Sequence, residues 1–141
     1  MMGQEGSVSK TAKGEFTVSL KPLDFGNADA SAKLGRMSID KRISGDLVAT
    51  TQGQMITAMG EMPGSAAYSA VERVTGTLAG RTGSFALQHT GVMDRGVPSL
   101  SIAVVPDSGT DELAGISGDF KIIIEDGKHL YEFAYTFAPG E

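Results

Sequence analysis

The chain has 141 residues, the size of one domain, and its formal net charge is −5. It contains no cysteine, which excludes disulfide bonds and thiolate chemistry, so an oxidising compartment is not implied. Lysine and arginine are scattered rather than clustered, and we therefore expect no nucleic-acid partner.

The N-terminal segment predicts a tail followed by a single folded unit. Residues 1–13 are polar and contain no apolar run of the length of a secretion signal. We expect residues 1–13 to form a flexible tail and residues 14–138 to form one barrel domain. No segment approaches the ~20 apolar residues of a membrane-spanning helix. These features favour a cytoplasmic protein that contacts no membrane.

Three strands are expected in the first half of the chain, over residues 15–20, 36–43 and 47–59. The segment Phe25–Lys33 between the first two is small, polar and rich in turn residues, and we expect it to be mobile. The register between residues 36 and 59 stays open, because Ser44, Gly45 and Asp46 permit either a turn or a bulge.

Residues 66–93 carry the clearest strand pattern, with apolar and polar side chains alternating at a period of two. A Gly-Arg-Thr-Gly segment divides the pattern, and a two-residue loop at Arg81–Thr82 would pair Val74 with His89. A loop of odd length would bury polar groups, so we expect an even one. One face then carries Tyr68, Glu72, Val74, Leu78, Phe85, Leu87 and His89.

Two further hairpins are predicted in the second half. Arg95–Gly96 leads into residues 98–106, and Asp126–Gly127 is a strong turn signal because a type I′ turn needs positive φ at both positions. The second turn pairs Ile122 with Tyr131 and Phe120 with Phe133. The chain thus predicts an all-β fold of about eight strands in sequential order, which closes into an antiparallel up-and-down barrel to remove exposed edges.

Several segments closely resemble one bacterial family. They are ERVTGTLAGRTGSF (72–85), LQHTG (87–91) and VVPDSGTDELAGISG (104–118), in the order typical of the family known as domain of unknown function 3224. The resemblance covers residues 14–137. It implies a calycin-like, allene-oxide-cyclase-like barrel, distantly related to plant allene oxide cyclase and the dirigent proteins. It implies no known activity, and no catalytic residue of the cyclase can be carried over, because no local motif matches its site.

Glu72 and His89 are the residues with the strongest chemical signal. They are diagonal neighbours across the expected hairpin, on an otherwise apolar face. Burial would raise the pKa of the carboxylic acid and a protonated imidazole would lower it, which is how a general acid or base is tuned. The pair can equally be structural, either buried as mutual partners or exposed at the barrel mouth. Tyr68, further out on the same face, could offer its hydroxyl to a ligand.

Other features give weaker signals. The opposite face of the hairpin, with Arg73, Gln88 and several threonines, suits a solvated sheet or a polar subunit contact, and we expect a homo-oligomer. The acidic loop at residues 106–118 lacks the ligand spacing of a calcium site. His129, beside a turn, is expected to be exposed. We expect neither a metal nor a cofactor.

The sequence therefore predicts a barrel that binds a small apolar or amphipathic molecule, with Tyr68, Glu72 and His89 as its polar contacts. Seven methionines fit this prediction, because flexible thioethers adapt to variable apolar ligands. Two alternatives stay open. One is an isomerase or cyclase that acts on a lipid-derived substrate, and the other is a structural oligomeric barrel with a filled core. The identity of the ligand is not determined by the sequence.

Overall fold

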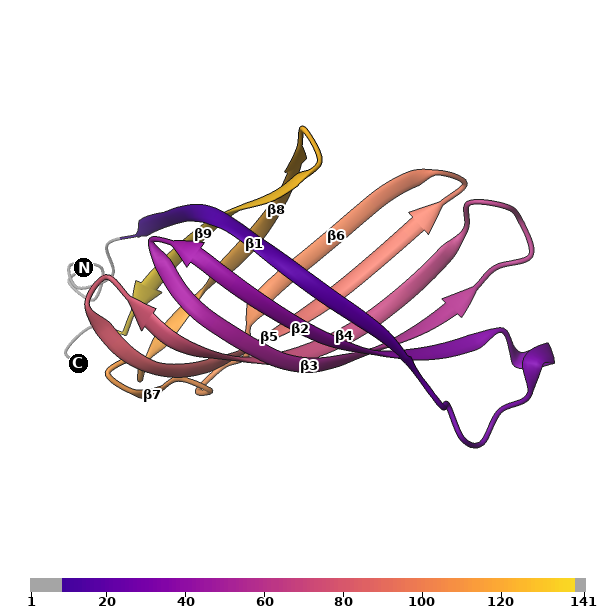
Figure 1. Ribbon diagram of the computed structural model, residues 1–141, viewed down its shortest axis with the longest axis horizontal. Coiled ribbons are helices and arrows are strands. Elements are labelled where there is room, and N and C mark those ends of the chain that lie inside the picture. Colours follow the sequence, from indigo (N-terminus) through magenta and orange to yellow (C-terminus); the bar gives the residue numbers. More distant parts are fainter. Residues whose placement is uncertain (1–8, 139–141) are drawn as a thin grey trace, which may run out of the picture.

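Antiparallel strands form a sheet that closes on itself in the computed structural model, which describes residues 9–138 (Figure 1). The ring runs β4-β3-β2-β1-β9-β8-β6-β5 and returns to β4, which confirms the predicted all-β, eight-stranded antiparallel barrel. A two-residue strand, β7, pairs with Gly83 and Ser84 near the start of β5. The strands are β1 (Lys10–Leu23), β2 (Leu34–Gly45), β3 (Leu47–Met59), β4 (Ala66–Leu78), β5 (Arg81–Asp94), β6 (Val97–Val104), β7 (Thr110–Asp111), β8 (Ile116–Glu125) and β9 (Lys128–Phe137).

Strand β1 begins at Lys10, ahead of residue 14, where the sequence suggests that the barrel starts. The remainder of the expected tail, residues 1–8, lies outside the described residues. Between β1 and β2 the chain forms a single 3-10 turn at Ala30–Ala32, and the carboxylate of Asp29 caps this turn by accepting a hydrogen bond from the Ser31 N–H.

The hairpin turns show which sequence signals set the register. Asp126 and Gly127 both have positive φ, and the β8–β9 pairing is the predicted one. The β4–β5 loop has two residues, as expected, but it lies at Ala79–Gly80 and not at Arg81–Thr82, so Val74 faces Phe85 instead of His89. Both loop residues have positive φ, which a β-branched threonine would adopt at high cost. The shift is even, so each side chain keeps its predicted face.

The β2–β3 register, which the sequence leaves open, is set by a tight turn rather than a bulge. Ile43 pairs with Ala49 and Leu34 with Ala58, and Gly45 reaches φ 100° between the strands. The ladder is interrupted near Lys41, where the backbone N–H donates to the hydroxyl of Thr51 at 3.0 Å instead of a carbonyl. No extra residue is inserted, so the inward and outward faces stay in phase along both strands.

The two ends of the barrel differ. We call the end with the β2–β3 and β4–β5 turns the closed end, and the opposite end, with the β3–β4 connection and the β5–β6 turn, the open end (Figure 1). Pairing of β1 with β9 stops at Phe16 and His129, and β6 pairs with β8 only at Ala103 and Asp119. Beyond these pairs, towards the open end, the ring is incomplete, and β1 to β6 continue as a curved sheet.

Aromatic side chains fill the closed end. The rings of Phe85 and Phe133 stack at 5.6 Å between centroids, and those of Phe120 and Tyr131 at 5.2 Å. Full burial of a large apolar side chain contributes roughly 1.5–3 kcal/mol relative to exposure. The Tyr131 hydroxyl ties this packing to the β2–β3 turn, because it donates to the Ser44 carbonyl at 2.7 Å and accepts from the backbone N–H at the start of β3 at 3.1 Å. These four aromatic side chains are buried, with exposures of 0–3 %.

Candidate functional site

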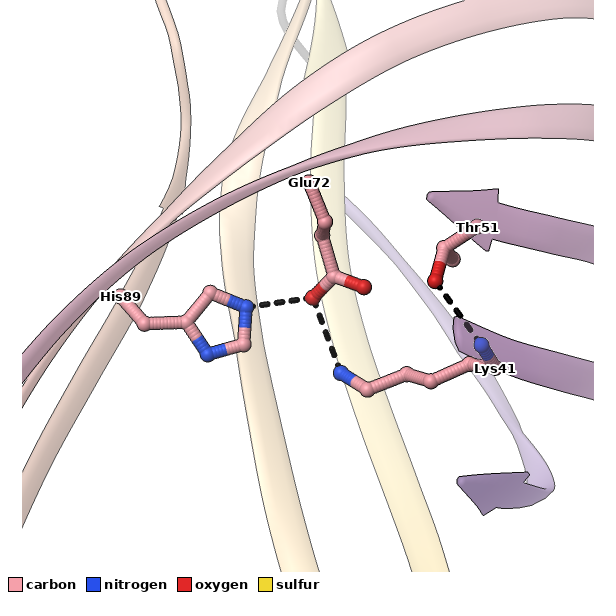
Figure 2. Close-up of polar contacts among 4 residues, drawn as sticks. All are labelled: Lys41, Thr51, Glu72 and His89. Atoms are coloured by element: carbon pink, nitrogen blue, oxygen red, sulfur yellow. Dashed lines mark hydrogen bonds and ion pairs between the residues drawn. The ribbon is translucent and has the colours of Figure 1, made fainter. Parts of the chain in front are cut away.

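Three ionisable side chains meet inside the barrel, and we call them the charge cluster: Lys41, Glu72 and His89 (Figure 2). They come from β2, β4 and β5, and each side chain occupies an inward position of its strand. Their relative exposures are 5 %, 2 % and 3 %. Lys41 Nζ donates to Glu72 Oε2 at 2.9 Å, and His89 Nε2 contacts the same oxygen. The predicted diagonal pair of Glu72 and His89 is therefore formed, and it is buried.

The cluster keeps Glu72 ionised. Burial alone would raise the pKa of this carboxyl, but the hydrogen bond from His89 and the charge of Lys41 outweigh it and lower the pKa from 4.5 to about 2. An ionised carboxylate only accepts hydrogen bonds, so Nε2 of His89 carries a hydrogen and donates it. The second oxygen, Oε1, is buried and has no hydrogen-bond partner within residues 9–138. At neutral pH Glu72 is thus a fixed charge and a weak base.

Lys41 is the member of the cluster that the sequence analysis missed. Its ammonium lies 4.9 Å from the centroid of the Phe16 ring and 5.7 Å from that of Phe120, distances at which the ring faces attract a cation. The signal was present in the sequence, because Ile39, Lys41 and Ile43 are spaced two apart and share one face of β2. A lysine between two buried isoleucines at a period of two is itself directed into the core.

A cavity of about 480 Å³ opens on the inner face of the sheet at the open end. We call it the open-end cavity. Its surface is mainly apolar, and the side chains that define it are Met37, Thr57, Met59, Tyr68, Met93 and Leu100. Glu72 and His89 do not line it. They lie one layer deeper, and the Tyr68 ring stands between, with its centroid 6.3 Å from that of His89.

Tyr68 is held by the strand beside it. Its ring lies against Gly91, where an added Cβ would come within 2.2 Å of the ring atom Cε1. Only a glycine leaves this space on β5. Burial and the nearby charge of Glu72 both raise the pKa of the Tyr68 phenol, so the hydroxyl stays protonated and can donate a hydrogen bond. The predicted site residues are thus neighbours in space, although only Tyr68 reaches the cavity.

The structure also places His129 and the acidic loop. His129 is half-buried rather than exposed, with its ring 5.2 Å from that of Phe16, so that expectation is wrong: its position on β9 directs it inwards. In the acidic loop, the hydroxyls of Ser108 and Thr110 accept hydrogen bonds from backbone N–H groups of β5. Within residues 9–138 no group of three or more histidine, cysteine, aspartate or glutamate side chains is placed to hold a metal ion.

Comparison with known proteins identifies the family. The family model described as "Protein of unknown function (DUF3224)" matches residues 12–135. The chain belongs to this family. A crystal structure of a DUF3224 protein with unknown function from Shewanella oneidensis MR-1, at 1.84 Å resolution, is 44 % identical in sequence. The similarity covers 94 % of this chain and 100 % of that chain, with a TM-score of 0.87.

The comparisons do not test the expected distant relationship to other barrel families. No curated protein matches this DUF3224 chain. The distant relationship to allene oxide cyclase and the dirigent proteins is not among the findings and stays a prediction. Within the part of the chain that the structure describes, no helix has the length and apolar character needed to cross a membrane.

Proposed function

We propose that this DUF3224 protein binds a small amphipathic molecule in the open-end cavity. One observation carries the proposal: an open, mainly apolar cavity lies directly above a buried, ionised cluster, while the rest of the interior is packed with side chains. Its volume of about 480 Å³ falls in the range of ~300–1,000 Å³ typical of small-molecule sites. Apolar walls with few polar groups at one end are likewise typical of such sites.

The lining residues suggest how the guest would be held. Met37, Met59 and Met93 come from three different strands and surround the cavity with flexible thioethers, which adapt to guests of different shape. An apolar body would contact these side chains. A polar group of the guest would point to Tyr68, whose hydroxyl can donate to it. Glu72 would act through its charge and His89 through its ring contact with Tyr68, since both lie below the cavity wall.

The test uses 1-anilinonaphthalene-8-sulfonate (ANS), a fluorescent probe with an apolar body and an anionic group. Wild-type protein should bind ANS with a saturable titration and an intact near-UV circular dichroism spectrum, which excludes binding to a loosened core. Met93→Glu and Met59→Glu place a carboxylate in the wall and should each weaken binding by about tenfold or more, which corresponds to ~1.4 kcal/mol.

The matched control is Thr17→Glu, which adds the same charge at an exposed, outward position of β1. It should leave the ANS titration unchanged. Absence of saturable binding to the wild-type protein, or equal loss in the control and the two wall variants, would refute the proposal. Native mass spectrometry of freshly purified protein would show a copurified guest directly.

A second candidate is an isomerase or cyclase that acts on a lipid-derived substrate. The buried contact between a carboxylate and an imidazole, one layer below the cavity, favours it. With the Glu72 pKa at about 2, the carboxylate cannot act as a general acid at neutral pH, so His89 would have to move the proton. Under this alternative a copurified guest would be converted by wild-type protein and not by His89→Gln. An isomerisation changes the structure of the guest but not its mass, so conversion would be followed by chromatographic retention or NMR. Under the binding proposal the guest would stay chemically unchanged with both proteins.

A further inference from the structure

Charge divides the outer surface of the barrel into two halves. Within residues 9–138, the outward-facing positions of β3, β4, β5 and β6 carry two charged side chains, Arg73 and Asp94. Asp94 is the last residue of β5, and the Arg73 guanidinium donates to the carbonyl of Ser108 in its own chain at 3.1 Å. These four strands are consecutive neighbours in the sheet (Figure 1). We call their outward-facing side chains the neutral wall.

The other four long strands are different. Outward positions of β1, β2, β8 and β9 carry two or more charged side chains on every strand, interspersed with uncharged ones. The charged ones in this half are Lys13, Glu15, Lys21, Arg36, Asp40, Arg42, Asp119, Lys121, Glu125, Lys128 and Glu132. Since both halves come from one sheet of similar strands, the contrast is not a consequence of the fold.

The neutral wall also exposes aliphatic side chains. Ile56, Val71 and Val92 are 50 %, 56 % and 46 % exposed, and they come from β3, β4 and β5. Between them lie glutamine, serine and threonine: Val71 pairs with Gln54 on one side and Gln88 on the other. Depletion of charged residues is what distinguishes the core of a protein interface from the remaining surface. The neutral wall shares this depletion of charge and adds exposed aliphatic side chains.

We propose that the neutral wall is the contact surface for a second copy of this chain. A twofold contact brings each patch against itself, so its side chains must be self-complementary. Serine, threonine and glutamine satisfy this condition, because each both donates and accepts hydrogen bonds. A twofold contact through a densely charged surface would place like charges near each other, and a wall with two charged side chains largely avoids this repulsion. A partner of opposite charge would instead require charged side chains on the wall.

This inference is independent of the proposed ligand site, because the cavity is lined mainly by inward-facing residues of the same strands and the wall consists of outward-facing ones. A dimer can therefore form whether or not a guest binds. Equally, ANS can bind a protein that is monomeric, so failure of one proposal does not imply failure of the other.

The test is the molar mass in solution, measured by size-exclusion chromatography with light scattering and by sedimentation velocity over a concentration series. The monomer has a mass of 14.7 kDa, and wild-type protein should be at least twice as heavy. Val71→Lys at the centre of the wall should raise the dissociation constant on the order of a hundredfold or more, because juxtaposed like charges cost several kcal/mol. Ser69→Lys is a second variant, at the neighbouring outward position of β4, and replaces the wild-type serine, which is smaller than valine. It is used if Val71→Lys fails to fold.

Thr17→Lys is the matched control, since it adds the same charge at an exposed position of the charged half. It should keep the mass of the wild type, and all three variants should keep the far-UV circular dichroism spectrum of a β protein. Wild-type protein that is monomeric throughout the concentration series would overturn the inference. So would a control that dissociates the assembly as strongly as the two wall variants.

Discussion

Replacing Glu72 by glutamine should destabilise the protein far more than the loss of one surface charge. The substitution keeps the shape of the side chain but removes the negative charge that the buried Lys41 ammonium requires. Removing one partner of a buried ion pair costs about 3–5 kcal/mol, since the remaining charge is left uncompensated. Domains are stable by about 5–15 kcal/mol in total. We therefore expect a large fraction of the stability to be lost and the melting temperature to fall on the order of 10 °C.

The measurement is urea-induced unfolding followed by circular dichroism, on wild type, Glu72→Gln, Lys41→Met and the double variant. Removing both charges leaves no unpaired ion, so the double variant should be clearly more stable than Glu72→Gln. A loss below about 1 kcal/mol for Glu72→Gln would be the value of an exposed ion pair and would refute the reasoning. A double variant no more stable than Glu72→Gln would refute it as well.

The pH dependence provides a second readout of the same pair. The native pKa of Glu72, about 2, lies below its ordinary value of 4.5, so between these pH values the unfolded chain binds the proton more readily. The stabilisation from ionisation, about 3 kcal/mol, is therefore complete above pH 4.5 and declines as the pH falls towards 2. The difference in unfolding free energy between wild type and Glu72→Gln should shrink over this interval. A constant difference would show that the ionised carboxylate is not what stabilises the wild type.

Two further substitutions test the closed end and the cavity wall. Tyr131→Phe removes the hydroxyl that makes hydrogen bonds of 2.7 and 3.1 Å with the β2–β3 turn, and in thermal denaturation it should lower the free energy of unfolding by about 1–3 kcal/mol. The hydroxyl of Tyr135 makes no hydrogen bond within residues 9–138, so Tyr135→Phe should change the free energy of unfolding little. Gly91→Ala should displace the Tyr68 ring and weaken ANS binding severalfold. Gly76→Ala, where the new Cβ would lie 2.1 Å from a backbone oxygen, should mainly lower stability. A stronger loss of ANS binding in Gly76→Ala than in Gly91→Ala would contradict the assignment of Tyr68 to the cavity wall.

Local signals predicted the fold because they act between neighbours in the chain. Asp126–Gly127 fixed the β8–β9 register, since few dipeptides adopt positive φ at both positions. The same rule, applied to β4–β5, favours Ala79–Gly80 over Arg81–Thr82, because glycine suits the second position and threonine does not. The prediction chose the wrong pair of residues but the right parity, and parity alone decides which side chains face inwards.

The candidate site was only partly predictable for a different reason. Glu72 and His89 lie on adjacent strands of one hairpin, so alternation and pairing bring them together. Lys41 is separated from Glu72 by 31 positions and joins it only because β2 and β4 flank the same strand, β3. The open-end cavity exists because the β1–β9 and β6–β8 ladders stop early, and no local pattern marks where a ladder ends.

The position of the charge cluster relative to those ladder ends links stability to the proposed binding. Lys41 lies over Phe16, the last β1 residue paired with β9. His89 pairs with Ile102, next to the single ladder pair between β6 and β8. The cluster thus occupies the last complete layer of the ring, with packed aromatic rings on one side and the Tyr68 wall on the other. A guest that replaces water above Tyr68 would lower the local dielectric and strengthen the attraction between the cluster charges. Occupancy of the cavity and integrity of the ion pair should therefore reinforce each other.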